Sequence, residues 1–403
     1  MSNPRLQPVL FNIGTKHAIN SIKEEASGKQ LGMYSRYEPF NRIFTKYFRY
    51  DRILLIGGNS SGGKSYLKSK LKLDFTDTQD LILPIDKTKT KLIEQLTTIG
   101  EFYLDGDNLV KPSINSKYHK PVLFIDFSFE MSIESEMHRL ISIYTGYNTE
   151  YLKSSLMING RYETIKDESV EFIESLLTGL TKQKQHSIIT FNRAGTALEI
   201  QEVILHFAKI FPEHQIISSI DHSLLTKRHD ERSDLELQNN LIKTSIDTKA
   251  MLGDRLMQII LLQMNSDIED DNRRTKPALH YPIQADLYMG GQMFQGADNV
   301  LVLYSPSKAH IEYYGTTKTP TVVLDSQVKN LIESSVPDLR RKLIHASIIK
   351  NRDGDLGQTW FLNDLHKGKI TPISREVISK DNHYIFSERP NYLDYIKSKR
   401  LGY

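Results

Sequence analysis

Apolar residues along most of the chain form short, nearly continuous runs that alternate with stretches of helical periodicity. Between about residues 30 and 373 these runs are RILLIGG, PVLFIDFS, SIITF, QIISSID, QIILLQ, NVLVLYS and ASIIK. Strands buried on both faces of a parallel sheet have this pattern, and the helices between them serve as crossovers. The pattern predicts an α/β fold with a mostly parallel central sheet covered by helices on both faces.

A short amphipathic helix is predicted near the start of the chain. Residues 16–28, KHAINSIKEEASG, place Ala18, Ile19 and Ile22 at helical spacing among charged residues, and Gly28 is a suitable end. The apolar stripe is too small for an independent core. We therefore expect this helix to pack either on its own domain or on a neighbouring chain.

Two polar segments set the remaining boundaries. Residues 74–119 are rich in Thr, Asp and Lys and include DKTKTK, which predicts a surface insertion outside the sheet. Residues 374–403 mix Ser, Asp, Asn, Pro and Tyr with a basic end, KSKR, and are predicted to form a peripheral tail. The chain then divides into an N-terminal segment with the short helix (1–29), a main domain (30–373) and the tail.

Composition excludes several classes of protein. With 403 residues, 39% hydrophobic and 25% charged, the chain is ordinary globular material with enough length for a sizeable core. The net charge is only +3, so any nucleic-acid surface must be local. The absence of cysteine excludes disulfides and cysteine-ligated zinc. No signal peptide and no membrane-spanning run is recognisable, so we expect a soluble, cytoplasmic protein without a membrane partner.

A glycine-rich loop follows the first apolar run. Its candidate nucleotide-binding residues are Gly58, Asn59, Ser60, Ser61, Gly62, Gly63, Lys64 and Ser65. They complete the pattern GxxxxGK followed by Ser or Thr, between a predicted strand and a helix-compatible segment. Backbone amides of such a loop point at phosphate, and the helix N-terminus adds positive potential. We expect Lys64 to reach the β- and γ-phosphates of ATP and the Ser65 hydroxyl to coordinate Mg²⁺.

A magnesium-linked acid and an acid that activates water are also required. Asp126 and Asp221 each end an apolar run, and hydrophobicity alone favours Asp126 because Ser218 and Ser219 are poor residues for a central buried strand. Glu130 follows four residues after Asp126 and is the candidate base. In the alternative interpretation, these acids face solvent or belong to a helix start within SFEMSIESE.

Two later strand ends carry further candidates. Gln263 ends the run QIILLQ, where it could sense the γ-phosphate or satisfy local backbone groups. Lys350 and Arg352 stand two residues apart before the turn DGDLG, a spacing that points both cations to one side of an extended strand. They suit phosphate contact in a neighbouring subunit's site, although a solvated hairpin tip has the same pattern.

The order of the motifs resembles that of the DnaB-type replicative hexameric helicases of bacteria and phages, over roughly residues 17–365. The segments that carry the resemblance are KPVLFIDFSFEMSIESEMHRLISIYTG, QIISSIDHSLL, LLQMNSDIE, QADLYMGGQMFQGADNVLVLYS and IIKNRDGDLGQT. Together with the glycine loop they are far more specific than that loop alone. The resemblance implies a RecA-like P-loop ATPase acting as an ATP-dependent DNA helicase in replication.

The resemblance also implies roles for the candidates. Asp221, not Asp126, becomes the magnesium-linked acid, and Glu130 becomes the general base. Gln263 reports on the γ-phosphate, while Lys350 and Arg352 arrive from the next subunit of a six-membered ring. The short helix at 16–28 is then a linker that docks on the adjacent subunit.

Single-stranded DNA is the implied partner in the hole of the ring. The candidate contacts are Lys227, Arg228, Tyr288, Gly290 and Gly291. The family's DNA loop commonly carries an arginine before a turn of small residues, whereas Tyr288 and Met289 precede the two glycines here. Binding of a DNA phosphate by the glycine amides and stacking of a base on Tyr288 would replace that contact.

Other readings of the sequence remain open. The family's N-terminal domain, which binds primase, is not recognisable ahead of the short helix, so primase coupling is not carried over, and a primase or loader stays an open partner. The runner-up hypotheses are a RecA- or RadA-like recombination ATPase that forms filaments, and a non-unwinding ATPase of this fold that serves as a loader or scaffold.

Overall fold

The computed structural model describes residues 11–305 and 343–388, apart from short gaps inside these ranges. The gaps are residues 45–46, 60–61, 99–100, 154–155, 159–160, 186, 271, 274–275, 277–278, 289–290, 353, 365–367 and 379–382.

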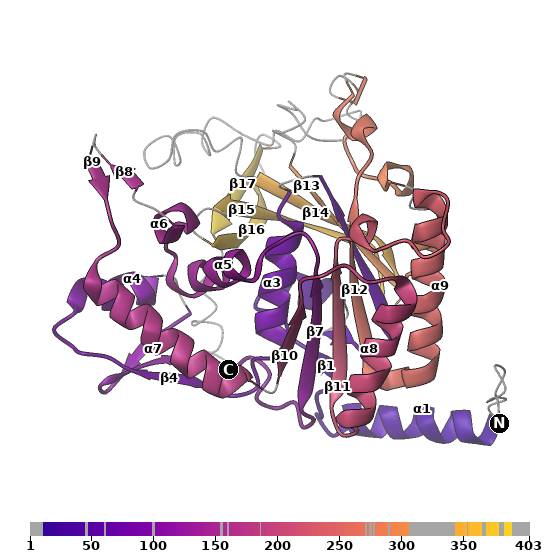
Figure 1. Ribbon diagram of the computed structural model, residues 1–403, viewed down its shortest axis with the longest axis horizontal. Helices are drawn as coiled ribbons and strands as arrows, with labels where there is room; N and C mark the ends of the chain where they lie inside the picture. Colours follow the sequence, from indigo (N-terminus) through magenta and orange to yellow (C-terminus); the bar gives the residue numbers. More distant parts are fainter. Residues whose placement is uncertain are drawn as a thin grey trace.

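A ten-stranded sheet forms the centre of the molecule (Figure 1). In spatial order its strands are β10 (Ile188–Phe191), β7 (Val122–Ser128), β11 (Gln215–Asp221), β12 (Leu256–Gln263), β3 (Arg52–Gly58), β13 (Asn299–Tyr304), β14 (Leu343–Asn351), β15 (Gly357–Asp364), β16 (Lys369–Ile378) and β17 (His383–Glu388). Neighbours from β10 to β13 run parallel, and the pairs from β13 onward are antiparallel. All the apolar runs are strands, as predicted; ASIIK, in β14, is antiparallel to its neighbours.

Helices cover both faces of the sheet, which confirms the predicted architecture. One face carries α3 (Lys64–Phe75), α5 (Ile133–Thr145) and α7 (Asp167–Lys184), and the other carries α8 (Ala197–Ile210), α9 (Asp234–Leu252) and the short α11 (Gly291–Gly296) (Figure 1). Strand β3 shows why: Leu54 and Ile56 join the core on the α3 side, while Ile53 and Leu55 join the core on the α8 side. Each buried aliphatic side chain contributes about 1.5–3 kcal/mol relative to an exposed one.

The predicted insertion forms a small sheet of its own. Its elements are β4 (Leu81–Pro84), α4 (Thr90–Thr98), β5 (Tyr103–Asp105) and β6 (Asn108–Lys111), with the strands in the antiparallel order β4-β6-β5. It lies outside the ten-stranded sheet, but Leu81 and Leu83 are buried and approach Gly179 of α7. A Cβ on Gly179 would stand 2.7 Å from the Leu83 side chain, so a glycine allows this close packing.

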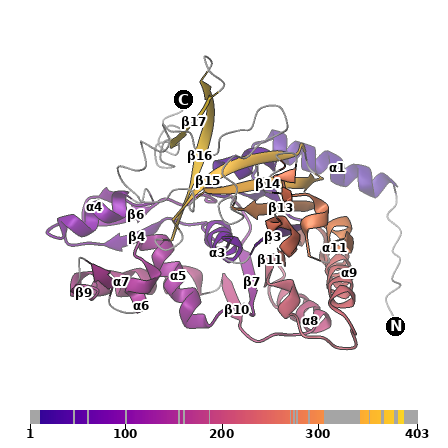
Figure 2. The ribbon, with the colours of Figure 1, turned by 90° about the horizontal axis from the view of Figure 1, so that it is seen from above.

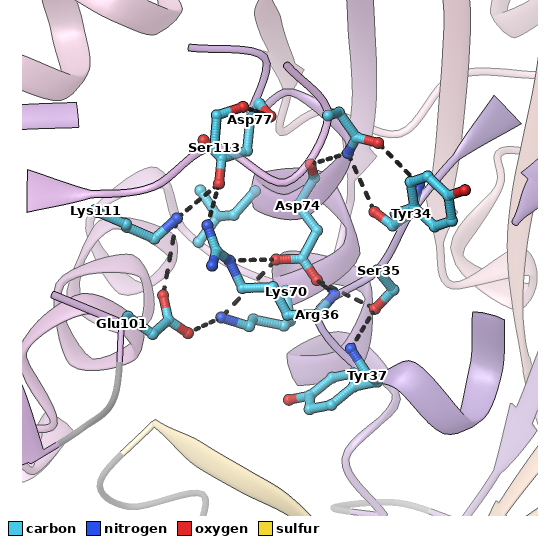
Figure 3. A network of polar contacts seen from close by, with 12 residues as sticks. Tyr34, Ser35, Arg36, Tyr37, Lys70, Asp74, Asp77, Glu101, Lys111 and Ser113 are labelled. Carbon is cyan, nitrogen blue, oxygen red and sulfur yellow. Dashed lines mark hydrogen bonds and ion pairs between the residues drawn. The ribbon is translucent and has the colours of Figure 1, made fainter. Parts of the chain in front are cut away.

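A buried network of charges joins the insertion to α3 (Figure 3). We call it the insertion cluster; its members are Arg36, Lys70, Asp74, Asp77, Glu101 and Lys111. Arg36 and Lys111 both pair with Asp77, the latter at 2.8 Å, and Lys70 pairs with Glu101. Burial alone would raise the pKa of Asp77 and of Glu101, but the surrounding cations outweigh burial and lower each pKa to about 2.

The N-terminal helix α1 (Phe11–Ala26) starts earlier than predicted and extends away from the body of the molecule (Figure 2). Gly28 follows it with a φ of +79°, which confirms the predicted stop. Ile19 and Ile22 are 50% and 67% exposed, so the apolar stripe of α1 is not covered by its own domain. The short elements β1 (Gly32–Met33), α2 (Glu38–Ile43) and β2 (Phe48–Arg49) then lead into β3.

The predicted boundary at residue 373 is not a structural boundary, because it falls within β16. Residues 374–378 continue that strand, and β17 pairs with it at the edge of the sheet. Both strands mix polar and apolar residues, which is typical of strands that are not buried on both faces. Strands β16 and β17 therefore contain no continuous apolar run that would predict them. Residues 389–403 of the predicted tail lie outside the described residues.

Candidate active site

A cavity of about 490 Å³ opens at the carboxyl ends of the parallel strands β3, β7, β11 and β12. It is lined by Asn59, Gly62, Gly63, Lys64, Ser65, Tyr66, Glu130, Met131, Ser135, Arg139, Thr149, Lys153, His222 and Gln263. This is the edge of an open α/β sheet at which ligands bind, and the volume is in the range of small-ligand pockets.

The glycine loop closes one end of the cavity and leads directly into α3. Gly63 precedes the helix with a φ of +92°, a left-handed conformation that favours glycine. A Cβ on Gly62 would stand 2.9 Å from the carbonyl oxygen of Asn59. Lys64 is the first residue of α3, and its Nζ donates to the carbonyl oxygens of Gly58 at 2.5 Å and Asn59 at 2.9 Å. Ser60 and Ser61 lie outside the described residues.

Asp221, at the end of β11, faces this loop. The Ser65 hydroxyl donates to Asp221 Oδ1 at 3.1 Å, so the loop and the strand end are in direct contact. Asp126, which hydrophobicity alone favours, lies opposite Ser219, two residues farther from the strand ends. Both acids are buried and neither lines the cavity, so the contact with Ser65 is what links Asp221 to the loop.

Beneath the cavity, α3 meets the sheet through buried charges, which we call the sheet cluster: Lys68, Lys72, Asp126, Glu136 and Asp221. Lys68 Nζ lies 3.1 Å from Asp126 Oδ1 and 3.2 Å from Asp221 Oδ2. Lys72 Nζ lies 2.6 Å from both Asp126 Oδ2 and Glu136 Oε1. Burial alone would raise the pKa of Asp126, but the two lysines outweigh burial and hold that pKa well below its usual range.

This cluster explains one of the two serines, Ser219, that make β11 look unsuited to a central position. The Ser219 hydroxyl donates to Asp126 Oδ1 at 2.6 Å, so a polar residue in this strand is satisfied by the buried carboxylate. Lys64, Lys68 and Lys72 recur every four residues and so share one face of a helix, but this spacing does not by itself show that the lysines are buried and paired.

Glu130 lies in the connection between β7 and α5 and is exposed to the cavity. A helix does start within SFEMSIESE, as the alternative interpretation predicts: Ser132 is the N-cap of α5 and accepts from the Ser135 amide at 3.2 Å. Glu130 lies before this cap and outside the helix. Gln263 ends β12 opposite Gly58 and lines the same cavity. The structure thus brings Glu130 and Gln263 together with Lys64 and Ser65.

Three basic residues of the cavity are among those that had no predicted role. His222 follows Asp221, and burial lowers the pKa of its imidazole although Glu130 and Asp221 oppose the shift. Arg139 of α5 and Lys153 of α6 (Thr149–Lys153) line the part contributed by these helices. Nothing in the sequence around Lys153 indicates a site, because its segment has neither a motif nor a strand end.

Lys350 and Arg352 lie near the amino-terminal ends of the parallel strands β3 and β13, opposite the ends at which the cavity opens. Lys350 Nζ donates to the carbonyl oxygens of Phe294 at 2.7 Å and Gln295 at 2.9 Å, and Arg352 pairs with Asp298 at 2.6 Å. Asp298 also accepts from the amide of Ile53, at the amino end of β3. The loop begins at the other end of β3, roughly 20 Å away. The two cations therefore do not reach the cavity of their own chain.

The candidate DNA contacts are partly brought together. Arg228 forms an ion pair with Asp234, and the Tyr288 hydroxyl donates to the other carboxylate oxygen of Asp234 at 3.3 Å. Lys227 is exposed beside Arg228. Gly291 begins α11, whereas Gly290 lies outside the described residues.

Fold and site together define a class of protein. A glycine loop between a central parallel strand and a buried helix, with an acid at the end of a nearby strand, is the site of a P-loop nucleoside-triphosphate-binding ATPase. The strand order, with helices on both faces and an antiparallel extension, gives it a RecA-like fold.

A family model described as the DnaB-like helicase C terminal domain matches residues 32–367. The chain belongs to this family, and it is an ATP-hydrolysing helicase of the replicative type. No curated protein matches its sequence. Searching the described residues reveals no helix long and apolar enough to cross a membrane.

Solved structures show the same fold. One of them, described as an ATPase domain, has a TM-score of 0.56 and 16% identity, over 88% of this chain and 97% of that chain. A DnaB-like replicative helicase, described with its interactions with primase, has a TM-score of 0.57 and 16% identity, over 91% of this chain and 67% of that chain.

Proposed function

We propose that the chain forms a ring that moves along single-stranded DNA and hydrolyses ATP at the interfaces between its subunits. One observation carries the proposal. Lys64, Ser65 and Glu130 lie at the carboxyl-terminal ends of the parallel strands, and Arg352 lies near their amino-terminal ends with 56% of its side chain exposed. A cation in that place does not reach the cavity of its own chain, so any nucleotide that it contacts is bound to another molecule.

Within the cavity, each residue has a role that its position supports. Lys64 leaves the loop carbonyls of Gly58 and Asn59 to bind the β- and γ-phosphates, while the amides of the loop and of the start of α3 hold the same oxygens. Gln263 lines the cavity at the end of β12, opposite Gly58, and from there it would report the presence of the γ-phosphate to β12.

The residues around Ser65 fit a bound Mg²⁺. Among the described residues no three carboxylates or histidines gather as a protein-only metal cage. Mg²⁺ commonly takes one or two protein oxygens, phosphates and water. The Ser65 hydroxyl and Asp221 Oδ1, 3.1 Å apart, offer such a pair. Bound there with ATP, the metal would neutralise charge on the phosphates that develops during transfer.

Glu130 is the proposed general base. Its carboxylate is exposed to the cavity, where it can accept a proton from the water that attacks the γ-phosphate. Arg352 of the adjacent subunit would approach the same phosphate, with Lys350 beside it, and stabilise the charge of the transition state. Both must exchange their intrachain contacts for this role, because Lys350 binds backbone carbonyls and Arg352 binds Asp298.

Exposed apolar side chains on helix α1 also favour assembly into a ring. Phe11, Ile19 and Ile22 are 89%, 50% and 67% exposed, which is unusual for apolar side chains of one helix in a monomer. We infer that this stripe docks on the neighbouring subunit. Helix α1 and the end of the sheet at which Arg352 lies would then both belong to the interface between subunits.

Single-stranded DNA is the proposed track. Lys227 and Arg228 are exposed after β11, and Tyr288 shares Asp234 with Arg228. Cations that bind phosphate and a tyrosine that stacks on a base give sequence-tolerant contact. Release of Asp234 from Arg228 and Tyr288 would make both available to a strand, and Gly290 and Gly291 would add backbone amides.

Separation of a forked DNA duplex tests this proposal directly. The chain is expected to open the fork in the presence of ATP and Mg²⁺, and its ATPase rate is expected to rise when a single-stranded oligonucleotide is added. Closed rings in electron micrographs would accompany this activity. Hydrolysis that is unaffected by DNA, with forks left closed, would favour a loader or scaffold, and filaments would favour a recombination ATPase.

A further inference from the structure

We propose that Lys68 is a positioning residue for Asp221: its buried ammonium holds one carboxylate oxygen so that the other faces Ser65. The inference rests on the proposed role of Asp221 at the magnesium site, and it adds a residue one helical turn beyond the glycine loop. Lys68 does not line the cavity, so it acts through Asp221 and not on the nucleotide.

The geometry divides the two oxygens of Asp221 between different partners. Oδ2 lies 3.2 Å from Lys68 Nζ, and Oδ1 accepts from the Ser65 hydroxyl at 3.1 Å. The Lys68 side chain is 0% exposed, and its stem is enclosed between α3 and the sheet. The contact is an ion pair without hydrogen-bond geometry, since Oδ2 accepts no hydrogen bond from the described residues. The attraction of a buried ammonium for Oδ2 nevertheless favours the rotation of the carboxylate that directs Oδ1 to Ser65.

Lys68 is itself held from the other side. Its Nζ lies 3.1 Å from Asp126 Oδ1 and within 3.9 Å of Glu136, so the ammonium stands between the site acid and two buried carboxylates. Ser219 and Lys72 bind Asp126 in turn. A chain of contacts therefore runs from Asp221 through Lys68 to the interior of the sheet.

The charges of the sheet cluster leave Asp221 partly available. Two lysines face three carboxylates, and Lys72 contacts Asp126 and Glu136 but not Asp221. The surplus negative charge of the cluster therefore falls on the carboxylate nearest the cavity. This arrangement suits an acid whose free oxygen is oriented toward a cation beside Ser65.

Two double variants separate positioning from general stability. Lys68→Met with Asp126→Asn removes one cation and one anion and leaves Asp221 Oδ2 without its ammonium. Lys72→Met with Glu136→Gln also removes one cation and one anion, but leaves the contact between Lys68 and Asp221 in place. Because both keep the net charge of the cluster, a difference between them reports the loss of the Lys68 contact.

The measurement is a Mg²⁺ titration followed by the fluorescence of a labelled ADP. We expect the first double variant to need about tenfold more Mg²⁺ for half-maximal binding, with unchanged ADP affinity in EDTA. The second is expected to stay within about twofold of the unmodified chain. Equal midpoints for the two variants, or no Mg²⁺ effect in the unmodified chain, would overturn the proposal.

A structure of the unmodified chain with Mg²⁺ and ADP provides a second measurement that does not depend on the folding of a variant. We expect Lys68 Nζ to remain within hydrogen-bonding distance of Asp221 Oδ2, and separation of the two groups would overturn the proposal. Neither measurement involves DNA. Failure to open forks would therefore reject the helicase proposal without affecting this inference, and an unchanged Mg²⁺ midpoint would do the reverse.

Discussion

Helix α3 contacts a buried charge cluster on each of two sides, and the clusters differ in what they join. The sheet cluster connects Lys68 and Lys72 to acids of β7, β11 and α5 beneath the cavity. The insertion cluster connects Lys70 and Asp74 to the residues before α2 and to the insertion. Residues two apart on a helix point in nearly opposite directions, so one helix serves both clusters.

The difference lies in contact with the residues that line the cavity. No member of either cluster lines the cavity itself, but Asp221 of the sheet cluster accepts a hydrogen bond from Ser65, which does line it. We infer that the first cluster sets the geometry of the site and the second fixes the insertion to the body. Burial of charge is costly in both places and is balanced by ion pairs. The following variants test whether the two functions are separate.

The largest effect is expected at the cavity itself. Glu130→Gln should lower the rate of ATP hydrolysis about 1,000-fold, because the amide cannot accept a proton, while ATP binding and the melting temperature stay unchanged. Single-turnover hydrolysis and a binding titration measure both. Glu134→Gln, an exposed residue of the first turn of α5, is the matched control. Normal turnover in Glu130→Gln would transfer the role of base to another residue.

The insertion cluster should respond in the opposite way. Asp77→Asn removes the carboxylate shared by Arg36 and Lys111 and is expected to lower the free energy of unfolding by about 3–5 kcal/mol. The affinity of the remaining folded protein for nucleotide should change less than about twofold. Urea unfolding and nucleotide titration test both expectations. Asp107→Asn, at an 82% exposed side chain paired with Lys87, should cost less than about 1 kcal/mol.

A change of pH should affect the insertion cluster through Glu101. Its pKa is about 2 in the folded chain against an ordinary 4.5, so the unfolded chain takes up the proton first. The stabilisation, roughly 3 kcal/mol, is present above about pH 4.5 and is lost as the pH falls toward 2. Urea unfolding between pH 7 and pH 3 should show a shallower loss in Glu101→Gln than in the unmodified chain. Equal slopes would exclude this source of acid sensitivity.

A smaller effect distinguishes two adjacent serines of β11. Ser219→Ala removes a hydrogen bond to Asp126 and should lower the free energy of unfolding by about 1–2 kcal/mol. Ser218→Ala is the control, because the buried Ser218 hydroxyl has no hydrogen-bond partner within the described part of the chain. Its substitution should change stability by less than about 0.5 kcal/mol. Equal losses would remove Ser219 from the sheet cluster.

The strands and the glycine loop could be predicted because each leaves a local mark in the sequence. A buried parallel strand such as β12 is continuously apolar, and the loop combines fixed spacing with a preceding strand. Asp221 was different, because Ser218 and Ser219 are unfavourable in a central buried strand. Only the order of the motifs indicated that Asp221 ends such a strand. The reason became visible only in three dimensions, where Ser219 binds Asp126.

The charge clusters and the outer strands could not be predicted in the same way. The partners of Lys68 come from residues 126, 136 and 221, so no local pattern shows that a lysine at this position is buried and paired. Strands β16 and β17 mix polar and apolar residues, and a tail has the same composition. Lys350 and Arg352 were recognisable as cations at a strand end. The sequence did not show at which end of the parallel strands they lie, because this depends on the antiparallel pairing of β14 with β13.

Mixing two inactive variants tests the central claim, that the site is completed by a neighbouring subunit, most directly. Arg352→Ala chains keep an intact cavity with Glu130, and Glu130→Gln chains keep an intact Arg352. When the two are combined before ring assembly, some interfaces pair a whole cavity with a whole arginine. We predict that ATPase activity recovers to a measurable fraction of the unmodified rate. Activity that stays at the level of the separate variants would contradict a site shared between subunits.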